Sequence, residues 1–81
     1  MKRYYLGLDI HKRFSQVVVM GKEGKVVEQK RVEHADREGL RDYFSGYGGS
    51  EVAVEATVGW GWLAEELEAA GLEVHLCHPA A

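Results

Sequence analysis

Residues 4–32 read YYLGLDIHKRFSQVVVMGKEGKVVEQKRV, and this stretch carries the pattern of three successive β-strands. In the first strand the side chains alternate, with Leu6 and Leu8 on one face and Asp9 on the other. The β-branched run at residues 17–19 is typical of a central strand that is covered on both faces. The expected strands cover residues 4–9, 15–20 and 25–32.

A glycine-flanked turn joins the second expected strand to the third. Gly21 and Gly24 can adopt backbone conformations with φ above zero, which favours a hairpin at this point. Lys30 and Arg31 in the third strand suit an exposed sheet edge. The first part of the chain is therefore predicted to be a three-stranded antiparallel meander.

After residue 35 the pattern changes to alternating helices and strands. Asp36 is a suitable N-cap for a helix over residues 37–47, and Thr57 for a second helix over residues 58–70. The first helix has an apolar stripe formed by Leu40, Tyr43, Phe44 and Tyr47, and the second has one formed by Trp60, Leu63, Leu67 and Ala70. Two further strands are expected over residues 51–55 and 72–76.

The expected element order is β-β-β-α-β-α-β, which belongs to the α/β class. Right-handed crossovers would place the last two strands beside and parallel to the first. The result is a mixed five-stranded sheet with strand order 3-2-1-4-5, the ribonuclease H-like arrangement.

The size and composition describe a single domain, residues 1–81, with an ordinary content of apolar and charged residues. The single cysteine excludes an internal disulfide, and no apolar run is long enough for a membrane span, so we expect a cytoplasmic protein without a membrane partner.

Charge is divided unevenly along the chain. The net charge of −3 argues against binding nucleic acid by bulk electrostatics alone. Residues 1–35 nevertheless hold eight Lys or Arg against four acids, whereas residues 36–81 hold two against nine. Two interpretations stay open: two differently solvated faces, or a track for a polyanion along the N-terminal hairpin.

Two acidic residues follow apolar strands, Asp9 after the first and Glu55 after the fourth. In the expected sheet these strands are adjacent and parallel, so both carboxylates would emerge at the same edge, where α/β sheets bind ligands. A divalent cation such as Mg²⁺ or Mn²⁺ relieves the repulsion between two such carboxylates and can assist attack on a phosphodiester. The alternative is that each acid merely caps a turn or a helix start.

Other candidates carry weaker signals. His75, Cys77 and His78 are metal-ligand types, but no second cluster completes a tetrahedral zinc site. His11, beside Asp9, is either an acid–base group or an exposed polar residue. Trp60 is expected in the core, whereas Trp62 falls on another face of its helix and suits a contact with a partner.

Three stretches, taken in order, resemble a known family. They are YLGLDIHK at residues 5–12 followed by FSQ, VAVEAT at residues 52–57 followed by GW, and GLEVHL at residues 71–76 followed by a His-Pro pair. In this order and spacing they resemble the N-terminal, RuvC-like domain of the DEDD-type insertion-sequence transposases, the IS one-ten family, which are guided by a bridge RNA.

The resemblance implies a ribonuclease H-like fold with four acidic metal ligands in the order Asp, Glu, Asp, Asp. Asp9 matches the first and Glu55 the second, with Mg²⁺ or Mn²⁺ as the expected metal. In the family the other two acids lie beyond the His-Pro pair, so we expect a truncated domain that is inactive alone. DNA and a bridge RNA would be the partners of the complete protein, and Lys12, Arg13 and Thr57 are the expected nucleic-acid contacts.

The leading hypothesis is therefore the N-terminal part of a DNA transposase or recombinase. A non-catalytic binding or self-assembly module that forms homo-oligomers is the alternative. A third interpretation, an actin-like ATPase, would require a second phosphate loop and a second domain.

Overall fold

The computed structural model describes residues 3–55 and 60–77. Its elements in chain order are β1 (Tyr5–Ile10), β2 (Phe14–Met20), β3 (Val26–Glu33), α1 (Arg37–Ser45), β4 (Glu51–Glu55), α2 (Gly61–Ala69) and β5 (Glu73–Cys77). The sheet order is β3-β2-β1-β4-β5, so the predicted mixed five-stranded sheet is confirmed.

The register places β1 at the centre of the sheet. It pairs antiparallel with β2, where Leu8 lies opposite Val17, and parallel with β4, where Leu8 lies opposite Val54. The two neighbours of β1 run in opposite directions because of the way the strands are connected. A tight turn joins antiparallel strands, whereas a helical crossover joins parallel ones.

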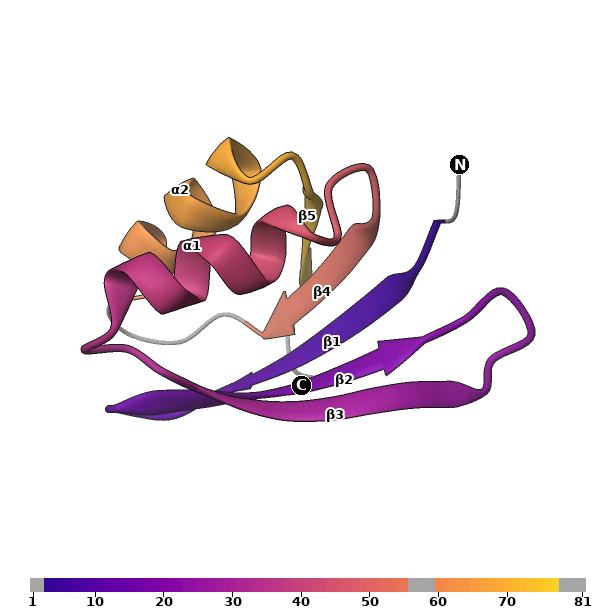
Figure 1. The fold of residues 1–81 in the computed structure, drawn as a ribbon, viewed down its shortest axis with the longest axis horizontal. Coiled ribbons are helices and arrows are strands. Elements are labelled where there is room, and N and C mark those ends of the chain that lie inside the picture. The colour runs from indigo at the N-terminus through magenta and orange to yellow at the C-terminus, as the bar shows by residue number, and fades with distance from the viewer. Residues whose placement is uncertain (1–2, 56–59, 78–81) are drawn as a thin grey trace.

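Both helices lie on the same side of the sheet (Figure 1). The crossovers through α1 and α2 move across the sheet in the same direction, from β3 to β4 and from β4 to β5. Right-handed connections that move in one direction must place their helices on one face. Among the described residues the opposite face carries no helix, and we call it the open face.

The open face corrects one prediction about the central strand. Val17 and Val19 are fully buried beneath the helices, but Val18 points to the open face and is only half-buried. The β-branched run alone led to the prediction that both faces are covered. Such a run indicates a buried strand, but it does not show on which side of the sheet a helical crossover passes.

The core lies between the helices and the inner face of the sheet. Its buried apolar residues are Leu6, Leu8, Val17, Val19, Val32, Leu40, Phe44, Val52, Val54, Leu63, Leu67 and Leu72. The predicted helix stripes are confirmed, because Leu40 and Phe44 of α1 and Leu63 and Leu67 of α2 are buried. Trp60 and Trp62 are both half-buried against this core.

The helix bounds differ from the predicted ones at particular residues. Asp36 caps α1 as expected, accepting a hydrogen bond from the Gly39 amide, but the helix ends at Ser45. Gly49, with φ of 88°, turns the chain toward β4. Thr57, the predicted cap of α2, lies outside the described residues, and α2 begins after Trp60.

Polar contacts tie the helices to one another and to the sheet. Glu66 of α2 accepts hydrogen bonds from Arg37 and Arg41 of α1, and the hydrogen bonds from these guanidinium groups lower the pKa of its carboxyl. On β3, Glu28 accepts hydrogen bonds from Tyr43 and Tyr47. Side-chain hydrogen bonds thus join α1 to α2, and join α1 and the segment just after it to β3.

In the part of the chain that the structure describes, no helix has the length and apolar character needed to cross a membrane.

Candidate functional site

Asp9 and Glu55 lie at the carboxyl ends of neighbouring parallel strands. The last residues at which β1 and β4 pair with each other are Leu8 and Val54, and Asp9 and Glu55 directly follow them. Both residues line one shallow hollow of about 430 Å³ on the open face. The predicted juxtaposition of the two acids at one edge of the sheet therefore agrees with where the structure places them.

Small side chains make this hollow. Gly7 and Ala53 lie opposite each other in the register, and a Cβ added at Gly7 would meet no atom within 4 Å. Val18 and Gln16 of β2 border the hollow on one side and Cys77 of β5 on the other. The carboxylates thus stand at the rim of an accessible depression that no described side chain fills.

The electrostatics of the hollow favour a cation. The Asp9 side chain is 75 % exposed, and its carboxylate lies 3.0 Å from Nε2 of His11. Glu55 is also exposed. Two carboxylates at one rim are hard oxygen ligands, and water molecules can complete the octahedral shell that Mg²⁺ requires. The donor set fits Mg²⁺ or Mn²⁺ and does not by itself form a closed site.

His11 belongs to a small aromatic and cationic stack beside Asp9. Its ring stacks on Phe14 at 4.6 Å between centroids, and the guanidinium of Arg31 lies 3.8 Å from the centroid of Phe14. The His11 amide donates to the Phe14 carbonyl oxygen at 2.8 Å, which closes the β1–β2 turn. The turn therefore has a defined shape directly after Asp9. We call the border of the hollow that carries Asp9 and Glu55 the acidic rim.

Lys12 and Arg13 lie in the same turn but line a different pocket. This second pocket, of about 520 Å³, is bordered by Lys12, Arg13, Glu33, His34, Ala35, Arg37 and Trp62, and we call it the basic pocket. Sequence reasoning had singled out Lys12, Arg13 and Trp62 separately but had missed His34 and Arg37. Thr57 lies outside the described residues.

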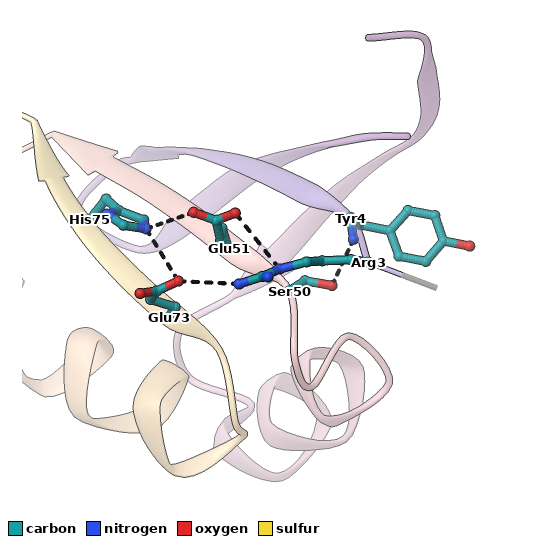
Figure 2. Close-up of polar contacts among 6 residues, drawn as sticks. All are labelled: Arg3, Tyr4, Ser50, Glu51, Glu73 and His75. Atoms are coloured by element: carbon teal, nitrogen blue, oxygen red, sulfur yellow. Dashed lines mark hydrogen bonds and ion pairs between the residues drawn. The ribbon is translucent and has the colours of Figure 1, made fainter. Parts of the chain in front are cut away.

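A third group of polar residues occupies the opposite end of the parallel strands (Figure 2). Glu51 and Glu73, the first residues of β4 and β5, lie opposite each other, and Nε2 of His75 is 2.9 Å from the Glu51 carboxylate. Together these three residues offer metal-ligating atoms within 4.8 Å of one another. Sequence reasoning missed this group, because only the strand register brings the two glutamates together.

Arg3 already neutralises part of the negative charge of this group. Its guanidinium lies 3.7 Å from the Glu51 carboxylate and 3.3 Å from that of Glu73. Nearby, the Tyr4 amide donates to Oγ of the buried Ser50 at 3.0 Å, which fixes the chain that carries Arg3. The arrangement acts as an exposed ion-pair network that joins the N-terminal segment to the sheet. Of the histidines considered as metal ligands, His75 contacts Glu51 in this network, whereas His78 lies outside the described residues.

No protein-family model matches this chain, and no curated protein matches it either.

Proposed function

We propose that this chain is the N-terminal part of a DNA transposase or recombinase that acts on phosphodiester bonds with a divalent metal ion. In this proposal Asp9 and Glu55 supply two carboxylate ligands for Mg²⁺ or Mn²⁺. The observation that carries it is that both acids line one hollow at the carboxyl edge of a sheet with order 3-2-1-4-5. The sequence resemblance to the RuvC-like domain supports the same two residues.

The chemistry explains why this edge suits a phosphodiester. Asp9 and Glu55 are exposed and would hold the ion at the rim, so a nucleic-acid backbone can approach from the side of the open face. A bound divalent ion would neutralise charge on the phosphate during in-line attack. Because the family pattern uses four acids and only these two match, we expect weak metal binding and no strand cleavage by these residues alone.

Manganese titration followed by NMR tests the metal site. Mn²⁺ broadens nearby amide signals, and we expect the signals around Asp9, Glu55 and Cys77 to broaden first. The Asp9→Asn and Glu55→Gln variants should each weaken Mn²⁺ binding about tenfold, which corresponds to about 1.4 kcal/mol. Glu65→Gln, which removes the same charge from the exposed side of α2, should leave the affinity unchanged.

Two results would contradict this proposal. Broadening that starts at Glu51, Glu73 and His75 would assign metal binding to the other end of the strands. Equal weakening by Glu65→Gln would show that Mn²⁺ responds only to the general negative charge of the chain.

The alternative function, a non-catalytic self-assembly module, has one observation in its favour. Among the described residues the edges of the sheet expose apolar side chains, namely Val26 and Val27 on β3 and Leu76 on β5. Exposed strand edges of this kind can pair with another chain. Sedimentation velocity over a wide concentration range tests it: a homo-oligomer that dissociates on dilution is expected, and a monomer at every concentration would exclude self-assembly.

A further inference from the structure

The basic pocket is formed where three separate segments converge at one end of the molecule. Lys12 and Arg13 come from the β1–β2 turn and Trp62 from the first turn of α2. The third segment runs from His34, just after β3, to Arg37, the first residue of α1. In Figure 1 these three segments lie together at the left of the view. The pocket thus depends on the tertiary fold and is not a run of charges along one helix.

The cations at its mouth are available for a ligand. Lys12 and Arg13 are exposed, and within residues 3–55 and 60–77 neither forms an ion pair. Among the described residues that border the pocket, Glu33 is the only acid, and it is paired with Arg31 at 2.6 Å. Lys12 and Arg13 therefore give the pocket a local positive charge in a chain whose net charge is −3.

The inner wall of the pocket is fixed in place. The guanidinium of Arg37 lies 4.0 Å from the centroid of the Trp62 ring and donates to the Glu66 carboxylate at 2.9 Å. The His34 ring meets Trp62 edge to face at 5.1 Å and is held by Ser15 at 2.7 Å. A planar guanidinium held on an aromatic ring offers both charge and a flat stacking surface.

These features match one kind of ligand. A volume of about 520 Å³ lies within the range of small-ligand pockets, about 300–1,000 Å³, and is sufficient for one nucleotide. Free Lys and Arg groups bind phosphate oxygens, and flat aromatic or guanidinium surfaces stack with bases. We infer that the basic pocket binds a single nucleic-acid strand, with a phosphate at Lys12 and Arg13 and the neighbouring base against the wall formed by Arg37, His34 and Trp62.

The pocket and the acidic rim are joined by one short turn. His11, which contacts Asp9, is followed directly by Lys12 and Arg13. The inference extends the proposed function, because a strand held in the basic pocket would pass close to Asp9. Trp62 is part of the wall that meets the base, and its ring also holds Arg37 in place.

Fluorescence anisotropy with a labelled single-stranded oligonucleotide of about 12 nucleotides tests the inference at low salt and in the presence of EDTA. We expect the double variant Lys12→Ala/Arg13→Ala to bind about tenfold more weakly. The slope of log K against log salt should also become shallower by about 0.7, because the variant loses one phosphate contact and each such contact on single strands contributes about 0.7.

The matched control is Lys22→Ala/Lys25→Ala, which removes two exposed cations from the β2–β3 turn at the other end of the sheet. This variant has the same net charge as the test variant and should keep the wild-type affinity and slope. If it loses as much affinity as the test variant, binding is unspecific and the inference is wrong.

The Trp62→Leu variant tests whether the wall of the pocket contributes to oligonucleotide binding apart from the charge of the pocket. It leaves every charge in place but removes the surface under Arg37, and we expect weaker oligonucleotide binding with an unchanged salt slope. Wild-type affinity in this variant would contradict the role of the wall. Circular dichroism confirms that each variant is folded before the affinities are compared.

Competition experiments identify the ligand. An unlabelled single strand, of DNA or RNA, should displace the probe far better than a duplex of the same length or inorganic phosphate. Equal competition by inorganic phosphate would reduce the pocket to a small-anion site and overturn the inference. Because EDTA removes divalent ions, strand binding in this experiment does not depend on the metal site, so failure of the metal proposal and failure of this inference give different results.

Discussion

Replacement of Phe44 by alanine is expected to lower the free energy of unfolding by about 3–5 kcal/mol. Phe44 is 1 % exposed, is among the largest fully buried side chains, and belongs to the hydrophobic core on the buried side of α1. Truncation removes its contacts on all sides and leaves a cavity that the surrounding strands cannot close. A domain of this size has only about 4–12 kcal/mol of total stability, so the variant should be barely folded.

Urea unfolding followed by circular dichroism measures this effect. The expected loss corresponds to a decrease of roughly 12–40 °C in melting temperature, at about 4–8 °C for each kcal/mol in a domain of this size. Phe44→Leu, which removes less volume, should cost about 1–2 kcal/mol and keeps the comparison measurable if the alanine variant is unfolded. Ser45→Ala, at the exposed neighbouring position, should change stability by less than about 0.5 kcal/mol. A similarly small effect at Phe44 would contradict its place in the core.

Replacement of Glu28 by glutamine should have the second largest effect, about 1.5 kcal/mol at neutral pH. One oxygen of the Glu28 carboxylate accepts hydrogen bonds from the hydroxyl groups of Tyr43 at 2.6 Å and Tyr47 at 2.7 Å. Hydrogen bonds to a charged group contribute about 1.5–3 kcal/mol when buried, and partial exposure reduces this figure. Glutamine keeps the shape but loses the charge that strengthens both bonds.

The Glu28 contact also predicts a dependence on pH. The hydrogen bond from Tyr43, followed by that from Tyr47, lowers the pKa of the Glu28 carboxyl below its ordinary value of 4.5. On the phenol side, burial first and the hydrogen bond to Glu28 second raise the pKa of Tyr43. Because the folded-state pKa of Glu28 is lowered, its contribution is complete above the ordinary value and is lost as the pH falls through the folded-state pKa.

Unfolding free energies measured from neutral pH to about pH 3 test this dependence. The difference between wild type and Glu28→Gln should be constant near neutrality and should shrink once the pH falls below 4.5. Glu23→Gln, at an exposed position in the hairpin turn, makes the same charge change and should show no such difference. A difference that persists at acid pH would mean that the substitution disturbs packing rather than the charged contact.

Much of the fold could be predicted because its signals are local. The alternation at Leu6 and Leu8 and the helical stripe at Leu40 and Phe44 reflect the two periods of secondary structure, and both sets of residues are buried. Boundaries were less certain, as α1 shows: the apolar stripe extends to Tyr47, but the chain leaves the helix after Ser45. The glycines that follow do not support further helical turns.

The neighbourhood of Asp9 and Glu55 was predicted for a topological reason. Once β1 and β4 are parallel neighbours, residues at their carboxyl ends must meet at one edge whatever the detailed packing. The same rules of handedness, applied to both crossovers, would also have predicted the open face. The prediction that both faces of the second strand are covered was wrong at Val18. It rested on the β-branched composition of the strand and did not use the direction of the helical crossovers.

Sequence alone was sufficient for the elements, their order and the edge where the two acids meet, because these depend on periodicity along the chain and on short, right-handed connections. Only the tertiary structure decided which side chains meet across elements. The pairing of Glu51 with Glu73 depends on the register of β4 against β5, and a shift of β5 by one residue would send Glu73 to the other face, away from Glu51. The basic pocket likewise exists because Lys12, Arg37 and Trp62, from three distant segments, are carried to one end of the sheet by packing in the core.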